Sequence, residues 1–192
     1  MHDFFSLLRT TLPLIGSVFV VTTMGCSQPA PFTLTLENNE AETRYLAATP
    51  GGTVRLPMQF EIGGSWEPVF DDDSFMCSRR CGEPGVVACP AIAWIETVWA
   101  ILPGESYILE HDGSALLVAS RGCTRDINLD GPIEVEICDG AAAEDWNDTV
   151  FTATTTGLVD SQDGLFVVNP RCRTETFDPT VEPEVLYDLN GG

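Results

Sequence analysis

The chain has 192 residues, of which 44% are hydrophobic, so it can bury the core of one domain and is not a wholly disordered protein. Nine basic residues oppose 29 acidic ones, and the net charge of −20 makes nucleic acid a poor partner because the phosphate backbone is repelled. All nine basic residues are arginine. Without lysine, the chain cannot form a Schiff base through a lysine amine, and it lacks the lysine of phosphate-binding loops.

The N-terminus predicts an export signal. Residues 12–21 (LPLIGSVFVV) form an uncharged apolar run that follows Arg9. This run is too short to cross about 30 Å of hydrocarbon as a helix. A short apolar stretch that ends in small residues is instead typical of a secretory signal peptide.

The end of this run carries the sequence Met24-Gly25-Cys26, which resembles the lipobox of bacterial lipoproteins. The resemblance implies that residues 1–25 are removed as a lipoprotein signal peptide and that Cys26 is acylated. Residues 26–31 would then be a linker behind a lipid anchor in the membrane.

Ser27 follows the cysteine, and in this family the residue at that position implies an outer-membrane lipoprotein of the cell envelope. The alternative is an ordinary signal peptide cut near Ala30, which would discard Cys26 and give a secreted or periplasmic protein.

The six remaining cysteines are even in number, and an exported chain keeps disulfides because its compartment is oxidising. They are Cys77, Cys81, Cys89, Cys123, Cys138 and Cys172. The sequence does not choose among their pairings. The alternative, zinc bound by the first three, lacks the paired close spacing of structural zinc sites.

Period-two alternation of apolar and polar residues predicts strands at 32–36, 54–62 and 133–137. Apolar segments beside turn residues predict further short strands at 44–47, 92–102, 106–110, 115–120, 150–156 and 165–168. Asp112-Gly113 predicts a hairpin turn that places Leu109 opposite Leu116 and Tyr107 opposite Val118.

The segments between these strands are predicted as loops, with one exception. Residues 63–90 contain three cysteines and several glycines and prolines, which indicate a cysteine-rich loop. Residues 141–146, preceded by Asp139 as a cap, predict one or two helical turns. Residues 178–192 read as an acidic, proline-containing tail that is mobile beyond Pro183.

Repeated short strands with glycine and proline turns predict an all-β fold, an antiparallel β-sandwich over residues 32–177. Residues 102–137, with Leu102-Pro103-Gly104, Asp112-Gly113 and Gly131-Pro132, resemble small immunoglobulin-like bacterial domains, among them the intracellular proteinase inhibitors of bacilli. The resemblance implies an immunoglobulin-like sandwich. Because function belongs to sites rather than folds, it does not establish inhibition.

Two groups of residues are candidates for chemical sites. His111 would have to serve any nucleophilic triad in the exported body, but its place in a turn favours an exposed surface residue. Asp126, Asn128, Asp130 and the following Gly131 match the start of a calcium loop. The twelfth position is Ile137 instead of a bidentate glutamate, so an acidic turn is favoured and no cofactor is predicted.

These observations predict a lipid-anchored, non-enzymatic binding or structural module with an unknown protein or glycan partner. Three alternatives stay open. One is a protease-inhibitor-like domain that uses 111–114 or Arg79 and Arg80. The others are a calcium-dependent binding domain and a secreted hydrolase that uses acidic residues.

Overall fold

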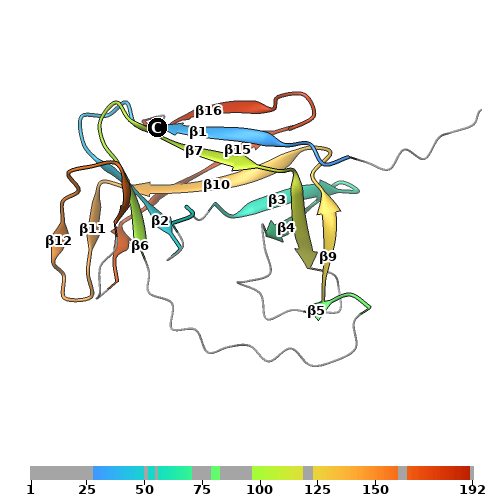
Figure 1. Ribbon diagram of the computed structural model, residues 1–192, viewed down its shortest axis with the longest axis horizontal. Helices are drawn as coiled ribbons and strands as arrows, with labels where there is room; N and C mark the ends of the chain where they lie inside the picture. The colour runs from blue at the N-terminus through green and yellow to red at the C-terminus, as the bar shows by residue number, and fades with distance from the viewer. Residues whose placement is uncertain are drawn as a thin grey trace, which may run out of the picture.

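The computed structural model describes residues 28–49, 52–54, 56–70, 79–82, 97–118, 123–159 and 164–190, which form an all-β structure without a helix among them (Figure 1). The strands are β1 (Phe32–Glu37), β2 (Arg44–Ala48), β3 (Met58–Ile62), β4 (Ser65–Phe70), β5 (Arg79–Arg80), β6 (Thr97–Ile101), β7 (Ser106–His111), β8 (Ser114–Val118), β9 (Cys123–Asn128), β10 (Ile133–Gly140), β11 (Ala142–Glu144), β12 (Val150–Phe151), β13 (Gly157–Val159), β14 (Phe166–Val168), β15 (Arg171–Phe177) and β16 (Glu184–Asp188). Within those ranges, nothing forms a helix of the length and apolarity that a membrane crossing needs.

A three-stranded sheet has the order β16-β1-β7, with β16 parallel and β7 antiparallel to β1. The alternation predicted for the first strand is confirmed. Phe32, Leu34 and Leu36 are buried, whereas Thr33 and Thr35 lie on the other face. This sheet lies at the top of Figure 1, and its buried face packs against the long strand β10.

The largest sheet follows the order β13-β6-β2-β10-β3-β4-β8-β9-β5, and β15 also pairs with β10. β10 pairs with β15 along its length, with β3 at its beginning and with β2 at its end. Its residues Ile133, Val135 and Ile137 are fully buried in the same core as Phe32 and Leu34. The strand predicted at 133–137 is therefore the centre of the fold.

A small third sheet, with the order β12-β11-β14, encloses a second core. The buried members of this core are Tyr45, Val98, Ala100, Ala143, Ala153 and Leu165. Tyr45 on β2 joins the large sheet to the small one, because its hydroxyl donates to the carbonyl of Phe151 on β12 at 3.3 Å and accepts from the amide of Ala153 at 3.0 Å.

The hairpin predicted around Asp112-Gly113 is wrong. β7 pairs with β1, whereas β8 pairs with β4 and β9, so the chain passes from the three-stranded sheet to the large one at this turn. Gly113 has a φ of 82°, as a tight turn needs. A turn signal predicts a change of direction, but it does not select the strand that comes next.

The predicted loop at 63–90 contains two strands, β4 and the two-residue β5. β4 pairs with β3 across Gly63 and Gly64, whose φ values of 61° and 85° suit a two-residue hairpin turn. The strand predicted at 54–62 begins only at Met58. Pro57 has no amide to donate, but its carbonyl accepts from the Glu136 amide at 2.8 Å and so continues the pairing with β10.

The helical turns predicted at 141–146 are also wrong, because residues 142–144 form β11 between β12 and β14. The helix preference of three alanines is weak and yields to a partner on each side. Asp145 then closes the turn to β12, since its carboxylate accepts from the amides of Asn147 and Thr149 at 2.8 and 2.9 Å.

The tail predicted at 178–192 is part of the fold up to its last described residues. β16 pairs with β1 over residues 184–188, and Leu189 is fully buried. β16 alternates over only five residues, with Val185 and Tyr187 directed inward. The turn residues and prolines at 178–183 precede this short pattern and led to the prediction of a tail. Parallel pairing of β16 with the distant strand β1 produces no local pattern in the sequence.

Candidate functional site

The strongest cluster of charges among the described residues surrounds Asp139, near the end of β10. Its side chain is fully buried. Three arginines approach it: Arg44 Nε and Arg171 Nη2 lie 3.6 and 3.3 Å from Oδ2, and Arg173 Nη2 lies 3.6 Å from Oδ1. A buried carboxylate requires such partners because its desolvation is costly.

The strand register explains this meeting. Asp139 pairs with Arg171 on β15, and Arg173 lies two residues farther along the same face of that strand. On the other side of β10, Asp139 pairs with Leu46 on β2, whose first residue is Arg44. Segments that are far apart in sequence therefore place their charges around one carboxylate.

Glu40 and the end of the chain complete the cluster, which we call the Asp139 cluster. Glu40 bonds to Arg44 and to Arg171, and the Leu189 carbonyl accepts hydrogen bonds from Arg171 and Arg173. The guanidinium of Arg173 also lies over the ring of Tyr187, 5.2 Å from its centroid. The cluster thus fastens the loop before β2 and the end of β16 to the central strand.

The charges in this cluster change the protonation equilibria of its members. Burial acts to raise the pKa of Glu40, but the hydrogen bonds and charges of Arg44 and Arg171 outweigh it, and the pKa is lowered. The hydrogen bond to Asp139 raises the pKa of Arg171. With three arginines against two carboxylates, the cluster is a locally positive spot in a chain whose net charge is −20.

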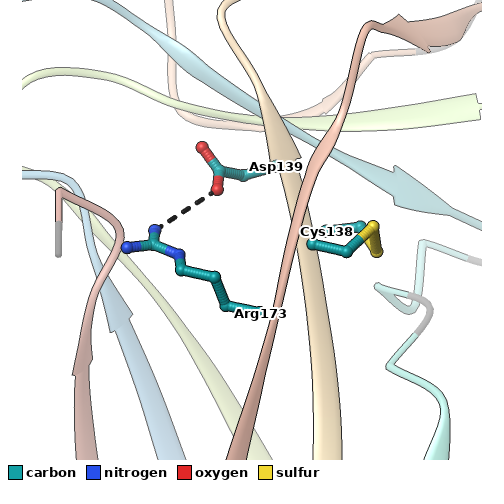
Figure 2. Close-up of a disulfide and its surroundings, with 4 residues drawn as sticks. Cys138, Asp139 and Arg173 are labelled. Atoms are coloured by element: carbon teal, nitrogen blue, oxygen red, sulfur yellow. Dashed lines mark ion pairs between the residues drawn. A yellow bond between two sulfur atoms is a disulfide. The ribbon is translucent and has the colours of Figure 1, made fainter. Parts of the chain in front are cut away.

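Disulfide Cys138–Cys172 lies directly beside this cluster but on the opposite face of the strands. Figure 2 shows Asp139 and Arg173 pointing toward one another on one side of β10 and β15, and the disulfide on the other. The two cysteines are register partners with Cα atoms 4.0 Å apart. The same end of this strand pair is therefore held covalently on one face and by ion pairs on the other.

A second disulfide, Cys81–Cys123, fixes the two-residue strand β5 to β9. The Cys81 amide also donates to the Thr124 carbonyl at 2.8 Å. The prediction that cysteines form disulfides is confirmed for these four residues. Cys77 and Cys89 lie outside the described residues, and so do Cys26 and the whole predicted signal peptide.

No family model, curated protein or solved structure matches this chain. The Asp139 cluster has the arrangement of a structural clamp, because its carboxylates and guanidinium groups are directed at one another and at a backbone carbonyl.

The calcium candidates Asp126 and Asn128 lie on strand β9, and Asp130 follows it. The extended backbone differs from a calcium loop, in which alternate oxygens curl around one ion. Asp126 instead accepts a hydrogen bond from Arg80 at 2.6 Å. Asp126, Asn128 and Asp130 line a shallow hollow of about 430 Å³ beside Phe60 and Ile62.

Within the described ranges, the one group of possible metal-ligating side chains lies at the Cys138–Cys172 disulfide. It consists of Glu136, Cys138 and Cys172. Both sulfur atoms are joined to each other, so they are not available as thiolate ligands.

His111 is buried, which corrects the prediction of an exposed turn residue. Its ring stacks on Phe32 with centroids 4.7 Å apart, and Nδ1 accepts from the Gly113 amide at 3.0 Å. The Ser114 hydroxyl donates to Asp112 at 2.5 Å, and this bond with that of the Ser114 amide lowers the pKa of Asp112. Both bonds belong to the turn and hold it in place.

Sequence reasoning did not find the Asp139 cluster and assigned Asp139 to a helix cap. The signal was present beside the cysteines: Asp139 follows Cys138, and Arg171 and Arg173 flank Cys172. Had that pair of cysteines been known, their register would have placed the three charges together. The sequence leaves the pairing of the cysteines open, so the position of these charged residues next to cysteines did not predict that they meet.

Proposed function

We propose that this chain is a lipid-anchored protein of a bacterial envelope that acts as a non-enzymatic binding or structural module. The single observation that carries the proposal is the pair of disulfides, Cys81–Cys123 and Cys138–Cys172, in an all-β body. Disulfides persist in oxidising compartments outside the cytoplasm. The apolar run at 12–21 and the resemblance of 24–26 to a lipobox point to the same compartment.

Two features support a role in binding or structure. The buried ring of His111 stacks on Phe32 within the core, where it stabilises the turn between sheets. The Asp139 cluster joins strands, with its carboxylate fully buried. Both sets of polar groups therefore contribute to the fold.

An immunoglobulin-like sandwich is the finer form of the fold that we propose. The observation in its favour is the shared core, in which Leu34 of the three-stranded sheet and Val135 of the large sheet are both fully buried. An experimental structure in which these sheets form the two layers of an immunoglobulin topology would establish it.

The anchor is tested by labelling with a fatty acid in the native host. We expect labelled palmitate to enter the wild type and the matched control Ser27→Ala, and not Cys26→Ala, because the thiol of residue 26 carries the lipid. Equal label in Cys26→Ala and wild type, or no label in any of the three, would contradict the proposal.

A further inference from the structure

The outward face of the three-stranded sheet carries an apolar row across all three strands. Thr35 on β1 is the register partner of Leu186 on β16 and of Ile108 on β7. Leu186 is 65% exposed and Ile108 is 57% exposed. Single exposed apolar residues are common, but here two of them share one row, with a threonine between them.

Acidic residues lie on both sides of this row. On one side the register places Glu184 and Glu110 beside Thr33. On the other side it places Asp188 beside Glu37. Strands lie about 4.8 Å apart and alternate residues about 6.8 Å apart, so each acidic pair is one repeat from the apolar row. We call these residues the acid-flanked row.

We propose that the acid-flanked row binds a cationic extended segment of another protein. The fitting pattern is an apolar side chain with lysine or arginine two residues before and two residues after it. Its apolar side chain would cover Leu186 and Ile108, and its basic groups would meet the carboxylates at the spacing of a strand. This inference rests on the proposed binding role and supplies its surface and partner chemistry.

The acidic residues beside this row make two other occupants of the surface unfavourable. A second copy of this face would bring carboxylates against carboxylates, which costs free energy. A membrane rich in anionic lipids would be repelled in the same way, and the net charge of −20 adds to that repulsion. A cationic polypeptide is the occupant that complements both the row and its flanks.

The test uses the full chain in non-ionic detergent and a fluorescent peptide of repeated Lys-Thr-Leu-Thr, with a matched peptide that has glutamate in place of lysine. Anisotropy is measured for the wild type, for Ile108→Thr with Leu186→Thr, and for Glu184→Gln with Asp188→Asn. The control variant is Val150→Thr, since Val150 is 61% exposed but lies in another sheet.

We expect the lysine peptide to bind the wild type and Val150→Thr equally, and each double variant at least tenfold more weakly. Added salt should weaken binding, and the glutamate peptide should not bind. Three results would overturn the inference: no binding of the lysine peptide, equal binding by the double variants, or wild-type self-association that Ile108→Thr with Leu186→Thr abolishes. None of these results would alter the palmitate labelling of Cys26, so the binding surface and the lipid anchor can be refuted separately.

Discussion

Asp139 is a fully buried carboxylate whose nearest opposite charges belong to three arginines on two other strands. Burial makes each of these charges dependent on the others. Arg44 is only 7% exposed and also pairs with Glu40, whereas Arg171 is 48% exposed and reaches water. Removal of the carboxylate therefore affects Arg44 most, because that guanidinium has little solvent to replace its partner.

We expect Asp139→Asn to lower the free energy of unfolding by about 3–5 kcal/mol, the range found when one partner of a buried ion pair is removed. Urea unfolding at neutral pH measures it. Asp130→Asn is the matched control because Asp130 is exposed, and it should change the free energy of unfolding by about 0.5 kcal/mol or less. Equal costs for the two variants would contradict the role assigned to the cluster.

Glu40 gives the cluster a predictable pH dependence. Its pKa in the folded state lies below the ordinary 4.5, so its contribution to stability is present above that value and is lost as pH falls through the lower folded value. The stability difference between wild type and Glu40→Gln should therefore narrow as pH decreases below 4.5. Urea midpoints between pH 7 and pH 3 measure this difference, with exposed Glu182→Gln as the comparison. A constant difference for Glu40→Gln would refute the assignment.

At the scale of elements, the alternation of apolar and polar residues predicted where strands lie better than it predicted which strands pair. β1 and β10 lie where alternation predicted strands, because each buries alternate residues over most of its length. β2 also lies where a strand was predicted, but its residues 44–46 are all buried, so its position was indicated by the turn residues that follow and not by alternation. β16 was missed and the β7–β8 hairpin was predicted wrongly, since both depend on pairing with distant strands. Local turn chemistry does not encode such pairing.

The turn at Gly113 offers a direct comparison of strain with steric conflict. Gly113 and Gly64 have φ values of 82° and 85°, so alanine is disfavoured equally at both by backbone conformation. A Cβ at Gly113 would lie 2.5 Å from the Ala30 backbone, whereas nothing lies within 4 Å at Gly64. We expect Gly113→Ala to cost about 1–3 kcal/mol more than Gly64→Ala in thermal or urea unfolding. Equal costs would show that the segment at residue 30 moves aside freely.

The end of the chain offers a second comparison, between two leucines three residues apart. Leu189 is fully buried, and Leu186 is 65% exposed. Leu189→Ala should cost about 2–5 kcal/mol, because it leaves a cavity in the main core. Leu186→Ala should change stability by about 0.5 kcal/mol or less. If urea unfolding gave both variants the wild-type stability, β16 would not be the folded strand described above.

At the scale of the whole molecule, the sequence predicted the all-β class and disulfide formation, but not which cysteines pair or how the charges meet. Those depend on the register of β10 with β15, where Cys138 faces Cys172 and Asp139 faces Arg171. The candidate site was missed for the same reason. A positive cluster in a chain with net charge −20 is created by folding and has no counterpart in the composition.

The proposed function requires an acylated, oxidised all-β protein in the envelope. The intact mass of the native protein, isolated from membranes without reduction and followed by a non-reduced peptide map, tests this requirement. We predict an acylated residue 26 as the first residue, with Cys81 linked to Cys123 and Cys138 linked to Cys172. A mass that begins downstream of Cys26, with these four thiols free, would contradict the account.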